Sequence, residues 1–124
     1  VHGNYIVDIA YAIIHNTRER FTVNKKNHGA ISNFDPEAVV ETPAYVGSMG
    51  AETINIGEIP TMQKGLMEMQ KAYEKLTVDA ALSGSYQTAL EAVLLNKTIP
   101  NYTVGKKVLD ELYEANKGLW PELH

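Results

Sequence analysis

The sequence has no cysteine, which excludes disulfide frameworks, thiolate zinc sites and thiol nucleophiles. It also has no apolar run that approaches the roughly 20 residues needed to cross a bilayer, so we expect no membrane partner. Positive charge is in the minority, with 11 basic against 15 acidic residues and a net charge of −4, and we therefore expect no nucleic-acid partner. A chain without cysteine is compatible with the cytoplasm, which is the location we expect.

Motifs that mark particular kinds of catalysis are missing as well. The sequence has no HExxH or CxxC metal motif, no GxSxG nucleophile motif and no GxGxxG nucleotide motif. The Gly47–Gly50 turn is too short to cradle a phosphate. The four histidines, His2, His15, His28 and His124, do not recur at the spacing of metal ligands on one helix face. Acidic residues are dispersed, so a catalytic carboxylate pair would have to be assembled by folding.

What the sequence does contain is 44% apolar residues in a chain of 124, enough for one packed domain. Apolar residues at intervals of three and four predict helices over residues 4–15 and 61–82. Alternation of polar and apolar residues predicts short strands over 20–23, 38–46 and 53–56. Because the strands follow one another, we expect an α+β fold with a small group of strands and packed helices. No linker or repeat divides the chain, so we expect residues 1–124 to form one domain.

Single residues mark where the first elements begin and end. Asn4 is the expected N-cap of the first helix, and Asn16 its expected end. Pro43 has no backbone N–H, which predicts a sheet edge or a bulge at that position. Gly65 lies inside a predicted helix, where it costs about 1 kcal/mol relative to alanine, and we interpret it as the sign of a close packing contact.

Two shorter helices are expected after residue 82, because apolar residues recur at helical spacing on either side of Pro100. Ser85 is the expected N-cap of the first, and Asn101 or Thr103 that of the second. The single tryptophan, Trp120, follows in the tail, where we expect its large indole to be docked on the rest of the chain.

The most informative segment is the polar connection between the first two predicted strands. Asn24, Asn27, His28 and Asn33 lie in or beside it, and His28 precedes a glycine that suits a tight turn. Polar loops of this kind often line binding clefts, and these four residues are our candidate cleft-lining residues. The alternative is that the asparagines only satisfy the backbone of the turn. Composition and spacing do not decide between the two.

The same segment carries a resemblance to a known family. Residues 23–35 read VNKKNHGAISNFD and residues 39–43 read VVETP, which resembles the VNxxNxGAIxNLPxDxxVEVP signature of glycoside hydrolase family four. The resemblance covers essentially the whole chain, since it continues through residues 2–8, 59–68, 72–78, 109–117 and 120–123. The Trp-Pro-Glu-Leu tail is similar to the 6-phospho-α-glucosidase (maltose-6-phosphate glucosidase) branch more than to the 6-phospho-β-glucosidase branch.

The resemblance implies a lactate/malate dehydrogenase C-terminal-domain-like fold and the C-terminal part of a larger enzyme. Such enzymes hydrolyse phosphorylated disaccharides with NAD and a divalent metal, usually Mn²⁺. NAD transiently oxidises the sugar at C3, the metal acidifies C2, elimination releases the aglycone, water adds, and the ketone is reduced again.

The family's machinery for this chemistry is not found in these 124 residues. The metal-holding cysteine has no counterpart, and the resemblance implies that the catalytic Asp and Tyr and the phosphate-binding Arg lie in segments before Val1. We therefore assign no catalytic, cofactor or metal residue to this chain. His28 stands where the family has Asn or Lys, and Phe34-Asp35 where it has Leu-Pro.

These observations lead to one hypothesis and two alternatives. Because Val1 lies close to a predicted helix, we expect a C-terminal fragment, inactive alone, that walls the active-site cleft and contacts an N-terminal nucleotide-binding domain. We also expect a homo-oligomer, with an interface on the helix face of Met62, Leu66, Met69 and Tyr73. The main alternative is a freestanding, non-enzymatic interaction domain derived from the same fold. A small hydrolase that uses dispersed carboxylates is the other.

Overall fold

The α+β class is confirmed in the computed structural model, which describes residues 2–124 and, for His2, the backbone alone. The described elements are α1 (His2–His15), β1 (Glu19–Lys26), β2 (Val39–Gly47), β3 (Gly50–Thr53), α2 (Thr61–Ser83), α3 (Tyr86–Leu95) and α4 (Tyr102–Ala115). They gather into two compact units, Val1–Lys64 and Gly65–His124. That residues 1–124 form one domain stays a prediction. No described helix is long and apolar enough to cross a membrane.

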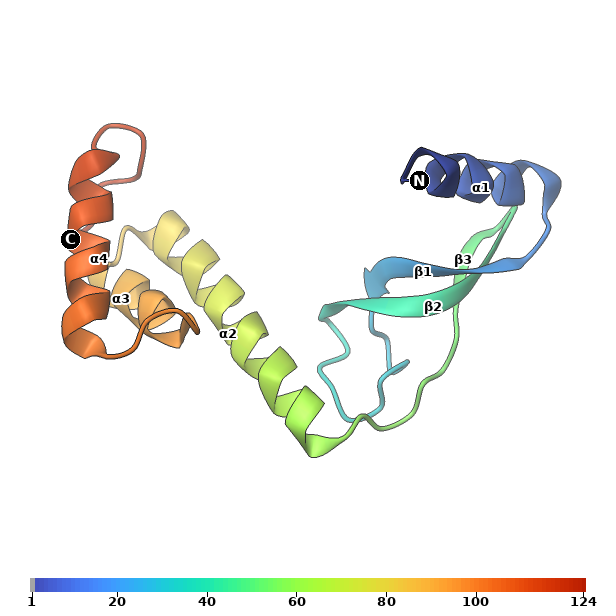
Figure 1. Cartoon of the computed structure of the whole chain (residues 1–124), viewed down its shortest axis with the longest axis horizontal. Helices are drawn as coiled ribbons and strands as arrows, with labels where there is room; N and C mark the ends of the chain where they lie inside the picture. The colour runs from blue at the N-terminus through green and yellow to red at the C-terminus, as the bar shows by residue number, and fades with distance from the viewer. Residues whose placement is uncertain (1) are drawn as a thin grey trace. The chain divides into compact units, whose positions relative to one another are not determined.

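The first unit is built on an antiparallel sheet with the strand order β1-β2-β3 (Figure 1). Phe21 on β1 lies opposite Ala44 on β2, as expected for strands predicted from alternation. Along β2 the buried side chains are every second one, namely Val40, Thr42, Ala44 and Val46. One face of the sheet therefore forms the core of this unit, because side chains alternate between the faces of a strand.

Two details of the sheet differ from the predictions. The third strand is Gly50–Thr53 and not 53–56, because pairing with β2 starts directly after the turn at Gly47↔Gly50. Ile56 leaves the sheet, and its N–H donates to the carbonyl of Ala30 at 2.7 Å. Pro43 lies on the middle strand and not at an edge, but at the point where β3 ends. At that point the absence of an N–H on Pro43 costs the sheet no hydrogen bond between β2 and β3.

Helix α1 packs against β2 and extends two residues further toward the N-terminus than predicted. It begins at His2, so the prediction of Asn4 as its N-cap was wrong, since the apolar spacing fixes a face but not the first turn. Its predicted end is confirmed, because the helix stops at His15 and Asn16 takes a positive φ of 51°. The Tyr5 ring meets Phe21 edge-to-face at 5.6 Å, and its hydroxyl donates to the carbonyl of Thr22.

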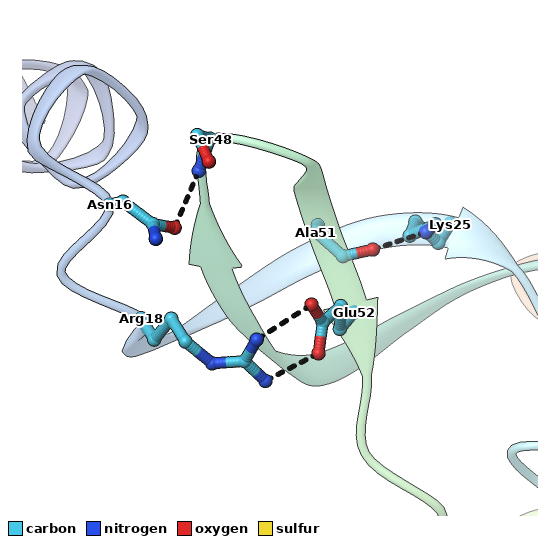
Figure 2. Close-up of polar contacts among 6 residues, drawn as sticks. All are labelled: Asn16, Arg18, Lys25, Ser48, Ala51 and Glu52. Carbon is cyan, nitrogen blue, oxygen red and sulfur yellow. Dashed lines mark hydrogen bonds and ion pairs between the residues drawn. The ribbon is translucent and has the colours of Figure 1, made fainter.

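Polar contacts hold the turn after α1 to the sheet (Figure 2). The side chain of Asn16 accepts from the backbone N–H of Ser48 at 3.0 Å. The Arg18 guanidinium donates to both carboxylate oxygens of Glu52 on β3, at 3.0 and 2.5 Å. The Lys25 ammonium on β1 donates to the carbonyl of Ala51. Residues far apart in the sequence thus fix the position of the helix end on the strands.

The second unit consists of helices and the C-terminal tail. The predicted caps are confirmed: Ser85 accepts from the N–H of Thr88 at 3.2 Å, and Asn101 accepts from the N–H of Val104 at 3.0 Å. Helices α3 and α4 pack closely, because a Cβ on Gly105 would come within 2.8 Å of Leu94. The interpretation of Gly65 as a packing contact is not supported, since a Cβ there would meet no described atom within 4 Å.

The C-terminal end of the tail is docked, although Trp120, whose docking was predicted, itself stays 39% exposed. The N–H of His124 donates to the carbonyl of Gly84 at 2.9 Å, and the N–H of Tyr86 donates to the carbonyl of His124 at 3.1 Å. Gly84 has a φ of +69°, and a Cβ there would lie 2.6 Å from the carbonyl oxygen of Glu122. Glycine is therefore required for this close approach of two backbones.

Candidate functional site

The candidate site is the connection between β1 and β2, residues 27–38, and its structure depends on Asn27. This side chain is 1% exposed. Its amide nitrogen lies 2.9, 3.0 and 3.1 Å from the carbonyl oxygens of Ile31, Phe34 and Asp35. Its amide oxygen accepts from the N–H of Ile31 at 2.7 Å. A buried amide with all of these partners acts as an internal scaffold for the loop.

The turn at His28 and Gly29 is confirmed. Both residues have positive φ, 43° and 86°, and Gly29 adopts this conformation without the steric cost that a side chain adds. The N–H of His28 donates to the carbonyl of Pro36 at 2.9 Å, and the N–H of Asn27 donates to that of Ala38 at 2.8 Å. The imidazole of His28 is left exposed on the surface of the loop.

Asn33 connects the loop to the segment that precedes α2. Its amide nitrogen donates to the carbonyl of Ile59 at 2.9 Å, and its amide oxygen accepts from the N–H of Ile59 at 3.0 Å. The N–H of Ser32 adds a bond to the carbonyl of Gly57 at 2.9 Å. The loop and residues 57–59 are therefore held together through backbone groups.

The four predicted residues thus divide into two pairs. Asn27 and Asn33 use their amides to satisfy backbone groups, which is the alternative that the sequence left open. Asn24, opposite Glu41 in the sheet, and His28 are exposed to solvent. An exposed amide and an imidazole can hydrogen-bond a polar ligand. That the four line a cleft stays a prediction.

An ion pair at the base of the loop was not anticipated from the sequence. The Lys26 ammonium lies 2.7 Å from the carboxylate of Glu37. This hydrogen bond raises the pKa of Lys26 and lowers the pKa of Glu37 from their ordinary values. The signal available in the sequence was the opposite charge of two residues that flank a turn. Both side chains are exposed, so the pair contributes little to stability.

Among residues 2–124 as described, no three His, Cys, Asp or Glu side chains come together as a group that could hold a metal ion. The imidazole of His15 contacts the Tyr11 ring, with ring centres 4.2 Å apart and the planes tilted by 37°. The backbone of His124 pairs with that of Gly84. The loop offers the hydrogen-bonding groups of its exposed side chains, such as the imidazole of His28.

The second unit contains an apolar cavity of about 420 Å³ that sequence reasoning missed. Several of its wall positions are alanines, which leave space where larger side chains would fill the core: Ala80, Ala81, Ala89 and Ala92. Tyr73, Leu109 and Trp120 also line it, and Trp120 stays 39% exposed. The alanines on the two helices were the available sequence signal for a cavity, but the sequence does not show which helix faces meet.

On α2, the face predicted as an interface is partly bare. Met62 is 73% exposed and Leu66 is 42% exposed, whereas Met69 and Tyr73 are half-buried. Apolar side chains at the start of α2 are therefore available for contact, while the later ones are used within the chain.

Comparison with known proteins gives the family. Residues 1–99 match the family described as Family 4 glycosyl hydrolase C-terminal domain. A 6-phospho-alpha-glucosidase of Leptotrichia buccalis is 54% identical over 122 residues, which are 98% of this chain and 28% of that protein. The chain thus spans less than a third of the length of this relative.

Solved structures give the same result. A 6-phospho-alpha-glucosidase from gut microorganisms, in complex with NAD and glucose-6-phosphate, is 48% identical and superposes with a TM-score of 0.88. The match covers all of this chain and 28% of the length of that protein. A second, in complex with NAD and Mn²⁺, is 41% identical with a TM-score of 0.89, again over the whole chain and 29% of its own. The chain therefore belongs to the family 4 glycosyl hydrolases, in the region of their C-terminal domain.

Proposed function

We propose that this chain is the C-terminal part of a 6-phospho-α-glucosidase that hydrolyses phosphorylated disaccharides such as maltose 6-phosphate. The observation that carries the proposal is the 54% identity to the Leptotrichia buccalis enzyme over 98% of the chain. The reaction we propose is the family's sequence of oxidation, elimination, addition and reduction. We further propose a cytoplasmic location and a lactate/malate dehydrogenase-like arrangement of the domain.

NAD and Mn²⁺ are the cofactors we propose for the longer enzyme, since solved relatives contain them. The described residues of this chain do not fit the metal, because they bring no three ligating side chains together. We therefore assign no step of the reaction through the metal to this chain, and we expect the chain alone to be inactive.

The part we propose for this chain is to wall the active-site cleft with the loop of residues 27–38. Support comes from the amides of Asn27 and Asn33, which fix the loop from inside and leave Asn24 and His28 exposed. A ligand-facing loop gains affinity when its shape is fixed before binding. The partners we propose are the N-terminal nucleotide-binding domain and, through α2, a second copy of the enzyme.

The test is an activity assay of the longer protein that contains this sequence. With NAD and Mn²⁺ it should release 4-nitrophenol from 4-nitrophenyl α-D-glucoside 6-phosphate and not from the β-anomer. Omission of NAD or addition of a chelator should abolish the release. Equal rates on both anomers would contradict the α-assignment, and no release from either would contradict the proposed activity.

A further inference from the structure

Helix α1 is apolar on the side that faces away from the sheet. Ile6, Val7 and Ile14 are 70%, 65% and 75% exposed, and Tyr11 and Ile13 are exposed as well. These are large side chains that a folded protein usually removes from water. Their number on a helix of 14 residues makes the surface unlike single, scattered apolar residues.

The pattern around the helix explains why this face is not an ordinary surface. Residues three and four apart share a helix face, so the sheet-facing row is Tyr5, Ile9 and Ala12. The outward rows contain no polar residue and are made of Gly3, Ile6, Val7, Ala10, Tyr11, Ile13 and Ile14. The polar residues after His2 are confined to one narrow flank: Asn4, Asp8 and His15. A helix that is apolar on two opposite sides is typical of the interior of a larger protein.

We infer that the outward face of α1, defined by Ile6, Val7, Ala10, Ile13 and Ile14, is the surface on which the remainder of the enzyme docks. The inference rests on the proposed function, because it takes the longer glucosidase as the source of the partner. This chain covers only 28% of the Leptotrichia buccalis relative, so a large body of additional chain is available to cover the helix. Gly3 and Ala10 on the same face allow close approach of another backbone.

The charges on α1 argue against a lipid surface as the occupant. Helices that lie on membranes carry Lys and Arg on their polar flank, where they meet anionic headgroups. Helix α1 has no Lys or Arg, and its one carboxylic side chain is that of Asp8. The occupant is therefore a protein surface that is itself apolar.

The test compares Ile6→Asp with Asn4→Asp in two proteins, the 124-residue chain and the longer enzyme. The two variants add the same charge in the first turns of the same helix, one on the outward face and one on the polar flank. Ile6→Asp should lower the thermal midpoint of the longer enzyme by about 4 °C and leave the midpoint of the 124-residue chain within about 1 °C. Asn4→Asp should leave both midpoints unchanged. Amide hydrogen exchange of α1 should be at least about 10-fold slower in the longer enzyme.

Other outcomes would overturn the inference and leave the proposed function to its own assay. Equal effects of the two variants in the longer enzyme would mean that nothing docks on this face. Equal destabilisation of both proteins by Ile6→Asp would mean that the chain covers its own helix. A chain that forms dimers by sedimentation and becomes monomeric only in Ile6→Asp would assign the face to a second copy. If the longer enzyme lacks glucosidase activity but shows the expected shifts, the docking face stands and the proposed function fails.

Discussion

Asn27 is the residue on which most of the candidate site depends. Its side chain bonds one N–H and three carbonyl groups of the loop, and it does so from a buried position. Deleting or reversing such a group leaves several buried backbone groups without partners at once. Asn24 is exposed to solvent, so the same substitution at Asn24 and at Asn27 compares an exposed with a buried amide in one segment.

Asn27→Asp should destabilise the chain by about 3 kcal/mol at pH 7, because a carboxylate would face three carbonyl oxygens and cannot donate to them. The neutral acid restores one donor, so the loss should be smaller at pH 4. Denaturant unfolding at both pH values measures the effect. Asn24→Asp is the control and should change stability by less than about 0.5 kcal/mol. Equal effects at the two positions would show that the loop does not depend on the buried amide.

A second group of residues, in the helical unit, joins a carboxylate, an ammonium and a phenol, and it predicts a dependence of stability on pH. The carboxylate of Asp110 lies 2.7 Å from the ammonium of Lys106 and accepts from the hydroxyl of Tyr86 at 2.6 Å. The hydrogen bond from Lys106, followed by that from Tyr86, lowers the pKa of Asp110. The hydrogen bond to Asp110 raises the pKa of Tyr86 from its ordinary value near 10.0.

The signs of these shifts fix the pH windows. A lowered pKa of Asp110 means a contribution to stability that is present above about pH 4 and is lost as the pH falls through the lower, folded-state pKa. A raised pKa of Tyr86 means a contribution that is present below about pH 10 and is lost as the pH rises above it. Asp110→Asn should reduce both the acid and the alkaline loss of stability, measured as the thermal midpoint of unfolding from pH 2 to 11. A variant whose pH profile matches the parent would contradict the assignment.

At the scale of elements, the tail segment and the turn between α2 and α3 depend on each other. The tail approaches so closely that Gly84 has no room for a Cβ beside the carbonyl of Glu122. Trp120 belongs to the same tail, lines the apolar cavity of the helical unit and is the one tryptophan of the chain. Its fluorescence therefore reports directly on whether the tail is docked.

Gly84→Ala should destabilise the chain by about 2 kcal/mol, because alanine is strained at φ +69° and would collide with the tail. The tryptophan emission should shift to the red as the tail detaches. Gly65→Ala is the control with the opposite sign, since a Cβ there meets open space inside α2. It should stabilise the chain by about 0.5 to 1 kcal/mol. A red shift in the control, or none in Gly84→Ala, would refute the argument.

Elements were predictable where their signals are local. Ser85 and Asn101 cap α3 and α4 as expected, because capping involves residues only three positions apart. The end of α1 at Asn16 and the turn at Gly29 follow from the same local chemistry. Pairing between distant segments was not predictable: the register that starts β3 at Gly50 depends on β2, and the tail bonds to Gly84 depend on the whole helical unit.

The candidate site was predictable as a location and not as a structure. Three asparagines in a short polar segment indicate a special loop, but the sequence does not show which amides turn inward. The structure places Asn27 and Asn33 on backbone groups and leaves Asn24 and His28 exposed. The apolar cavity and the bare side of α1 were missed because both are properties of packing.

At the scale of the whole molecule, the first turns of α2 are the surface that we propose for contact between copies of the enzyme. Leu66→Asp in the longer protein should lower its oligomeric state, measured by sedimentation, because it places a charge on the exposed apolar side of Met62 and Leu66. Thr61→Asp adds the same charge to another face of the helix and should leave the oligomer intact. An unchanged oligomer in Leu66→Asp would show that the interface lies elsewhere.

The amide network of the loop also has a consequence for chemical ageing. Deamidation of asparagine proceeds by attack of the following backbone nitrogen on the side-chain amide, with loss of ammonia. In the folded chain both reacting groups of Asn27 are engaged, since its amide bonds three carbonyls and the N–H of His28 bonds Pro36. Unfolding frees both groups, so each period spent unfolded at high temperature converts part of the population to a product with aspartate at the centre of the loop. Thermal unfolding of this chain should therefore become less reversible the longer the chain is held unfolded, because the altered side chain can no longer make the bonds that hold the loop.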